Sequence, residues 1–486
     1  MLYHSTRSKS NTVDSATAVL LGLAEDGGLY MPQSLPDFDA VACLQGDTYD
    51  MATRILTAFL PDIPDMKELV RRAYTGKFAA EDLTPTVPVG DFTVLELFHG
   101  PTSAFKDVAL SMLPQLLTAA KAEKKMDEDI LILTATSGDT GKAALEGFHD
   151  VPGIRICVFY PHGGVSKVQR AQMVTQEGSN VTVCAVEGNF DDAQTGVKNI
   201  FAACQDGELL KGKGFRLSSA NSINIGRLAP QVTYYFKAYK DLLDRGQIKM
   251  GEEVNFSVPT GNFGDILAGY LAKRLGLPVG TLICASNANN VLTDFIRTGT
   301  YDRRRPLHKT MSPSMDILVS SNLERLLYLL SGEDTALVAD LMAQLNTQGS
   351  YTVPDALLET IQKDFWAGCC DDVRAQAAIA RVWQAQGYLC DPHTATGWAV
   401  AEDYVNQTGD RRPMVVLSTA SAYKFPAAVL DALGSDLAAD EFDQMEQLNR
   451  ITGVVIPENL RTLRGREEKH TGVIPKDTML PFVLGL

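Results

Sequence analysis

One lysine in this sequence stands where an amine could act as a nucleophile or a base. Lys106 lies in the stretch His99-Gly-Pro-Thr-Ser-Ala-Phe-Lys-Asp107, just before a predicted helix that begins at Val108. The positive end of a helix dipole disfavours an ammonium ion, so this position suits a lysine that reacts as a neutral amine. Taken alone, the same lysine is also explained as a solvated surface charge.

A second candidate site is the turn Gly261-Asn-Phe-Gly-Asp265, which follows an apolar run and opens a helix-like stretch. The first amides of a helix lack partners within the helix, and together with the helix dipole they attract anions. Glycines let an anion approach the backbone closely. The turn therefore predicts a phosphate cradle, with a simple helix cap as the alternative. It matches neither Walker A nor G-x-G-x-x-G, which disfavours nucleotide triphosphates and dinucleotides.

A third candidate is the turn Ser137-Gly-Asp-Thr-Gly141, which also precedes a helix-like stretch. Its hydroxyls and amides could hold a carboxylate or a phosphate, and helix capping is again the alternative. A reactive lysine, a phosphate cradle and a turn of carboxylate size together indicate pyridoxal 5'-phosphate, bound to the lysine as a Schiff base.

The elements that must position these residues follow one repeated order. Apolar runs that begin at Ile130, Val254 and Met414 each lead into a small polar turn and then a helix-like stretch. This order predicts an α/β fold with parallel-rich sheets and helices on both faces. Ligands of such sheets bind beyond the carboxyl ends of the strands, so we expect the three turns to share one crevice. Residues 1–90 are predicted to be mainly helical, with helices over 15–23, 49–60 and 65–74.

Composition narrows the class of protein further. The 486 residues, 45% of them hydrophobic, can bury a large core and suggest about three domains or subdomains. The net charge of −15 disfavours nucleic acid or anionic membranes as partners, and no apolar run approaches the roughly 20 residues of a membrane span. The 8 cysteines and 7 histidines are dispersed, so we expect reduced thiols, no metal site and a cytoplasmic location.

A series of ordered phrases resembles the threonine synthases, best the longer bacterial and fungal type. The phrases that carry this resemblance span residues 97–107, 136–141, 221–224, 259–269 and 417–420, with further matches at 5–7, 26–30, 315–325 and 391–395. The resemblance therefore covers nearly the whole chain. Two positions depart from it: Ser421 stands where the family often has His, and Lys167 where Pro is expected.

The resemblance implies a fold-type II, tryptophan synthase β-like enzyme dependent on pyridoxal 5'-phosphate. Such an enzyme converts O-phospho-L-homoserine and water into L-threonine and phosphate, the last step of threonine biosynthesis. Lys106 would bind the cofactor covalently, and Thr419 would hydrogen-bond the pyridine nitrogen. The other implied residues are Gly261, Asn262, Phe263, Gly264 and Asp265 for the cofactor phosphate, and Ser137, Gly138, Asp139, Thr140, Asn221, Ser222, Asn224 and Arg227 for the substrate.

The resemblance also implies how the chain divides. The expected parts are an N-terminal region (1–90), a smaller α/β subdomain with the lysine (91–215), a larger one with the phosphate loop (216–430) and a C-terminal extension (431–486). We expect a monomer or a homodimer.

Two other functions fit the same motifs. A phospholyase on this scaffold would release phosphate but yield 2-oxobutyrate, and an inactive binding protein would keep only the fold. The presence of Lys106 speaks against the inactive protein.

Overall fold

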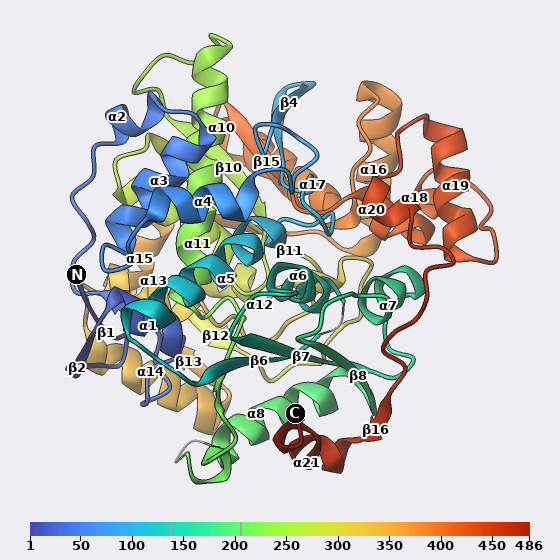
Figure 1. The fold of residues 1–486 in the computed structure, drawn as a ribbon. Coiled ribbons are helices and arrows are strands. Elements are labelled where there is room, and N and C mark those ends of the chain that lie inside the picture. Colours follow the sequence, from blue (N-terminus) through green and yellow to red (C-terminus); the bar gives the residue numbers. More distant parts are fainter. Residues whose placement is uncertain (137, 205–206) are drawn as a thin grey trace.

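Two mostly parallel sheets organise the chain, as the computed structural model of residues 1–136, 138–204 and 207–486 shows (Figure 1). The six-stranded sheet has the order β14 (Phe365–Cys369), β11 (Val279–Ser286), β10 (Val254–Pro259), β15 (Met414–Ser418), β5 (Phe92–Glu96) and β4 (Thr86–Val89), of which only β4 is antiparallel to its neighbour. The five-stranded sheet has the order β16 (Val473–Pro475), β8 (Val181–Glu187), β7 (Ile154–Pro161), β6 (Asp129–Ala135) and β9 (Phe215–Ser218), all parallel. The predicted α/β fold with parallel-rich sheets is confirmed.

The central strands of each sheet are buried on both faces, which explains why they are rich in Val, Ile and Leu. In β6, Ile130 and Ile132 pack into the central core, whereas Leu131 and Leu133 face a smaller cluster that includes Met479. The helices that cover the sheets and complete the chain are α1 (Ser15–Leu21), α2 (Ala40–Leu44), α3 (Thr48–Phe59), α4 (Met66–Tyr74), α5 (Lys106–Glu123), α6 (Asp139–Phe148), α7 (Lys167–Val174), α8 (Phe190–Ala203), α9 (Ile225–Leu228), α10 (Val232–Asp244), α11 (Gly264–Arg274), α12 (Val291–Thr298), α13 (Leu323–Leu330), α14 (Thr335–Gln348), α15 (Asp355–Asp364), α16 (Asp372–Gln386), α17 (Pro392–Thr408), α18 (Pro426–Ala432), α19 (Glu441–Thr452), α20 (Glu458–Arg461) and α21 (Met479–Leu484).

The N-terminal region is more mixed than its sequence predicts. The three expected helices are confirmed as α1, α3 and α4, but a three-stranded antiparallel sheet joins them, with the order β2 (Ser8–Asp14), β1 (Leu2–Ser5) and β3 (Tyr30–Pro32). The strand β2 is not predicted from the sequence because its residues are polar and largely exposed, so they show no apolar alternation. A second small antiparallel pair is formed by β12 (Thr300–Asp302) and β13 (Ser350–Thr352).

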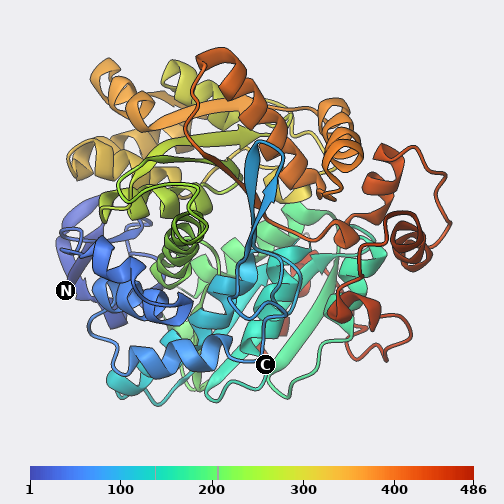
Figure 2. The ribbon, with the colours of Figure 1, turned by 90° about the horizontal axis from the view of Figure 1, so that it is seen from above.

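The three predicted strand–turn–helix segments divide between the two large sheets. The segment of β6 belongs to the five-stranded sheet, and those of β10 and β15 belong to the six-stranded sheet. In Figure 2 the colours follow the chain from β5, in the six-stranded sheet, into α5, which packs against α6, the helix after β6 of the five-stranded sheet. The three turns therefore follow strands of two sheets and not of one. The chain ends by returning to the smaller sheet, where β16 extends it and α21 packs against α8 (Figure 1). Within the described residues, no helix combines the length and apolar character needed to span a bilayer.

Candidate active site

The turn before α5 is organised by the carboxylate of Asp107. Its Oδ1 accepts a hydrogen bond from the Thr102 hydroxyl (2.5 Å), and its Oδ2 accepts one from the Thr102 amide (2.9 Å). Between them Ser103 takes the left-handed conformation, with φ of 59°. Burial raises the pKa of Asp107 to about 6, against the lowering effect of the Thr102 bonds. Lys106 is the first residue of α5, so the helix begins two residues earlier than predicted.

Lys106 lies beside Thr419, although 313 positions separate them in the chain. The amide of Phe105 donates to the Thr419 carbonyl (2.8 Å), and Ala104 forms an antiparallel bridge with Ala420. The lysine implied to hold the cofactor and the hydroxyl implied to face its ring nitrogen are thus fixed to one another by the backbone.

Burial brings the pKa of Lys106 close to physiological pH, so a useful fraction of its amine is neutral there. Burial lowers its pKa to about 8; the negative charge of Asp139 opposes this, and the positive charges of Lys424 and Arg227 add to it. The nitrogen lies 4.6 Å from the centroid of the Phe105 ring and has no hydrogen-bond partner within the described residues. A half-buried amine of this kind can act as a nucleophile or a base.

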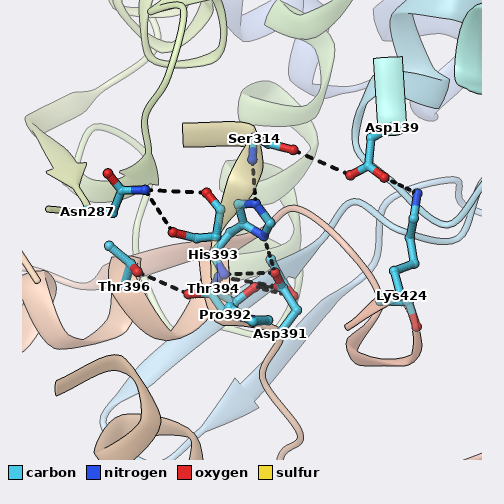
Figure 3. A network of polar contacts seen from close by, with 12 residues as sticks. Asp139, Asn287, Ser314, Asp391, Pro392, His393, Thr394, Thr396 and Lys424 are labelled. Carbon is cyan, nitrogen blue, oxygen red and sulfur yellow. Dashed lines mark hydrogen bonds and ion pairs between the residues drawn. The ribbon is translucent and has the colours of Figure 1, made fainter. Parts of the chain in front are cut away.

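Asp139, at the start of α6, is paired with a lysine that the sequence analysis did not select. The Lys424 nitrogen lies 2.7 Å from Asp139 Oδ1 (Figure 3), and it also donates to the Thr102 carbonyl (3.1 Å). Burial would raise the pKa of Asp139, but the charges of Lys424 and Lys106 hold it well below its ordinary value. The one sequence signal for Lys424 is its place four residues after the phrase 417–420, which resembles the family.

A buried histidine fixes the loop that meets Asp139 from the other side (Figure 3). His393 Nδ1 pairs with Asp391 Oδ1 (2.7 Å), and its Nε2 accepts a hydrogen bond from the Ser314 amide (3.2 Å). The Ser314 hydroxyl in turn donates to Asp139 Oδ2 (3.5 Å). An Nε2 that accepts a hydrogen bond is unprotonated, so His393 is neutral and positions Ser314.

The turn 261–265 presents its backbone as an anion cradle between β10 and α11. Within the described residues, its five amides have no hydrogen-bond acceptor. Its carbonyls are held from outside, by the Ser320 hydroxyl at Gly261 (2.8 Å) and by the Asn322 amide at Asn262 (3.0 Å). A Cβ at Gly261 would lie 2.7 Å from the Ser314 carbonyl oxygen, so only glycine fits there. The turn thus fits a phosphate group such as that of pyridoxal phosphate.

The acid of this turn, Asp265, faces two phenols. The hydroxyls of Tyr234 (2.6 Å) and Tyr235 (2.9 Å) donate to its Oδ1, while its buried Oδ2 has no partner within the described residues. Burial raises the pKa of Asp265 to about 6, against the lowering effect of the two tyrosines. The Asp265 carboxylate is therefore held beside the turn by hydrogen bonds from two uncharged hydroxyls.

Arg227 is a buried cation without a carboxylate partner in the part of the chain that the structure describes. Its guanidinium donates to the Ala220 carbonyl, and its Nε has no partner there. Burial lowers its pKa to about 10, which leaves it charged at neutral pH. An uncompensated buried cation is costly, so its presence beside Lys106 points to an anionic ligand.

The other residues predicted to bind substrate are placed unevenly. Asn221 is exposed and accepts a hydrogen bond from the Thr134 hydroxyl (3.4 Å), and Ser222 accepts one from the Asn322 side chain (3.2 Å). Both polar atoms of Asn224 have structural partners, because Oδ1 caps α9 and Nδ2 donates to Val19 in α1.

In the turn 137–141, the Gly138 amide donates to Thr136 (2.9 Å) and Thr140 is half-buried. Ser137 lies outside the described residues.

A residue of the C-terminal extension clamps the Lys106 turn. The Asn459 side chain donates to the Pro101 carbonyl (2.7 Å) and accepts from the Ser103 hydroxyl (3.0 Å). No sequence signal predicts this contact, since Asn459 belongs to no motif and lies more than 350 positions away along the chain.

Comparisons with known proteins agree with this site. Residues 78–420 match the family of pyridoxal-phosphate dependent enzymes, residues 2–74 the threonine synthase N terminus and residues 394–479 the threonine synthase C-terminal family. The first match spans the Lys106 turn, the cradle and Thr419. The chain is therefore a pyridoxal-phosphate dependent enzyme of fold type II, as expected.

Relatives and solved structures identify the family within that class. The chain is 41% identical to the threonine synthase of Pseudomonas aeruginosa, covering 97% of this chain and 98% of that protein. It superposes on the PLP-bound threonine synthase from Brucella melitensis with a TM-score of 0.88 and 40% identity, covering 100% of this chain and 98% of the other. The yeast threonine synthase structure gives the same TM-score at 33% identity, with the same coverage. The chain belongs to the threonine synthase family.

The match to one group of relatives is partial. The human protein named Threonine synthase-like 1 is 42% identical over 434 residues, which cover 86% of this chain. The match spans only 57% of the human protein.

Proposed function

We propose that this protein is a threonine synthase, which converts O-phospho-L-homoserine and water into L-threonine and phosphate with pyridoxal 5'-phosphate. The observation that carries the proposal is the backbone pairing that sets Lys106 beside Thr419, in a chain that matches the family along nearly its whole length.

The site offers three groups for the cofactor. Lys106 would bind it covalently, the amides of Gly261, Asn262, Phe263, Gly264 and Asp265 would hold its phosphate, and the Thr419 hydroxyl would face its ring nitrogen. When bound, pyridoxal phosphate supplies an electron sink that acidifies C–H bonds near the substrate amine. A neutral hydroxyl keeps the ring nitrogen less protonated than a carboxylate would, which favours elimination and replacement over transamination.

Lys106 is the base in this proposal. Formation of threonine requires proton removal at Cα and Cβ, loss of phosphate from Cγ, addition of water at Cβ and proton return to Cγ and Cα, so a mobile base must reach adjacent carbons. The lowered pKa of Lys106, about 8, leaves a useful fraction of neutral amine at neutral pH. The amine is unconstrained by hydrogen bonds to the described residues, which suits such movement.

Arg227 is the proposed partner of the substrate phosphate, because it is charged, buried and without a carboxylate partner within the described residues. Asn221 and Ser222 would flank the substrate, and the turn of Ser137, Gly138, Asp139 and Thr140 would take its carboxylate. Asp139 and Asn224 would act indirectly, since their polar atoms already have partners.

Product identification tests the proposal. Purified holoenzyme incubated with O-phospho-L-homoserine should release phosphate and L-threonine in equal amounts, measured by NMR. A phospholyase would give 2-oxobutyrate with the same phosphate yield, and an inactive binding protein would give neither. Either of those results would refute the assignment. The cytoplasmic location, the monomeric or dimeric state and the absence of nucleic-acid or membrane partners stay predictions from the sequence.

A further inference from the structure

We propose that Lys424 is a positioning residue: it occupies the Asp139 carboxylate and so keeps that carboxylate from pairing with the Lys106 amine. The inference deepens the proposed function, because it rests on Lys106 as the residue that holds the cofactor.

The geometry of Lys424 makes it a bridge between two turns. Its side chain is 0% exposed and that of Asp139 is 4% exposed, so water cannot screen the pair. The nitrogen lies 2.7 Å from Asp139 Oδ1 and 3.1 Å from the Thr102 carbonyl, which belongs to the Lys106 turn. One ammonium group thus ties the start of α6, the helix after β6, to the turn that presents Lys106.

The charges around Lys106 show what this bridge does. Lys106 faces Asp139 from α6, Asp107 from its own helix, Asp265 from α11, Arg227 from α9 and Lys424 from the segment after β15. Asp107 is hydrogen-bonded by Thr102 and Asp265 by two tyrosines, so Asp139 is the one of these three carboxylates that forms an ion pair with a lysine.

Asp139 itself faces Lys424, Lys106 and His393. If Lys424 were removed, Lys106 would be the cation left to compensate a buried carboxylate, and a buried unpaired charge is costly. The positive form of the Lys106 nitrogen would then be stabilised.

A pH titration of the holoenzyme tests this reading directly. The visible absorbance of the protein-bound cofactor reports protonation of the nitrogen that links it to Lys106. In Lys424→Gln the midpoint of that titration should rise by about one pH unit, because the Asp139 charge is no longer compensated. Lys237→Gln is the matched control. It removes another buried lysine from an aspartate, Asp241, and should leave the midpoint unchanged.

Two further variants keep the inference falsifiable even if Lys424→Gln folds poorly. In Asp139→Asn the midpoint should fall below that of the wild type, since Lys424 stays positive and the negative charge is lost. In the double variant Asp139→Asn/Lys424→Gln it should return towards the wild-type value. An unchanged midpoint in Asp139→Asn, or an upward shift that persists in the double variant, would overturn the proposal.

Failure of this inference is distinguishable from failure of the proposed function. The titration measures the charge of one nitrogen and does not depend on which product is made. A protein that yields 2-oxobutyrate would refute the threonine assignment, whereas a midpoint insensitive to Lys424 and Asp139 would refute only the positioning role.

Discussion

The turns 137–141 and 261–265 look alike in sequence but differ in how their amides are used. Each follows a parallel strand and opens a helix. In the first, the Thr136 hydroxyl accepts from the amides of both Gly138 and Gly141 (2.9 Å each). In the second, the five amides have no acceptor within the described residues. The Thr136 hydroxyl thus uses two amides of the first turn, whereas within the described residues all five amides of the second turn are open to an anion.

The carboxylates of the two turns, Asp139 and Asp265, differ in the charge of their partners. Asp139 is paired with a lysine, and its pKa lies well below the ordinary value. Asp265 is hydrogen-bonded by two neutral phenols, and burial raises its pKa to about 6. Both are buried, so the charge of the partner decides the direction of the shift. The carboxylate of the turn 137–141 therefore forms an ion pair, whereas the carboxylate of the turn 261–265 is held by uncharged donors.

The largest expected effect comes from removing the amine that both turns surround. Lys106→Ala should abolish threonine formation and the visible absorbance of bound cofactor, because no other amine in the described site lacks a partner. Far-UV circular dichroism should be unchanged, since the side chain has no hydrogen bond to the described residues. Measurable turnover in this variant would contradict the assigned role of Lys106.

Arg227→Met separates substrate binding from cofactor binding. We expect kcat/KM for O-phospho-L-homoserine to fall about 100-fold, because a charge-assisted hydrogen bond contributes about 1.5–3 kcal/mol. Cofactor absorbance should be retained. Arg216→Met, at an exposed arginine paired with Glu128, is the control and should have no effect. Equal kinetics of the two variants would show that Arg227 does not meet the substrate phosphate.

Two glycine variants test the difference between the turns themselves. Gly261→Ala places a Cβ 2.7 Å from the Ser314 carbonyl, so the cradle must distort and the Kd for pyridoxal phosphate should rise about tenfold, which is about 1.4 kcal/mol. In Gly138→Ala the added Cβ would clash with the Gln169 side chain, so this variant should raise KM for the substrate instead. Equilibrium dialysis and steady-state kinetics measure the two effects.

Gly472→Ala is the control for both glycine variants, since its Cβ finds no atom nearer than 3.9 Å. If both site variants change the same parameter, the two turns serve the same ligand and the proposed division between them is wrong.

The sequence predicted best those segments in which the site residues and the strand or helix pattern lie in one short run. The run from Val254 to Arg274 predicts a strand, an anion turn and a helix, and the structure has all three as β10, the open turn and α11. That the strand β6 belongs to one sheet and the strands β10 and β15 to another could not be predicted, because strand pairing joins residues far apart in the chain and leaves no local pattern. The polar strand β2 was missed for the related reason that its pairing uses backbone groups.

Side-chain partners were the least predictable part of the site. Lys106 was found because it begins a helix beside other motifs, whereas a lysine in the position of Lys424 is typical of a surface residue until its burial is known. Likewise, nothing in the sequence shows that Asn224 uses both polar atoms to cap α9 and to hold α1. Both cases depend on distant segments that meet only in the folded chain.

The smallest expected effect tests whether the C-terminal extension shapes the site. Asn459→Ala removes the two hydrogen bonds that hold Pro101 and Ser103 in the Lys106 turn. The turn keeps its bonds to Asp107 and to the segment of Thr419, so we expect a loss of only about threefold in kcat and about 1 kcal/mol in the free energy of unfolding. Asn449→Ala is the matched control, because it breaks a side-chain bond to Val454 in the same extension but outside the site. That variant should lose similar stability and keep its kcat. An equal loss of kcat in both variants would mean that Asn459 acts through general stability, whereas a loss confined to Asn459→Ala would show that the extension holds the lysine turn in its working shape.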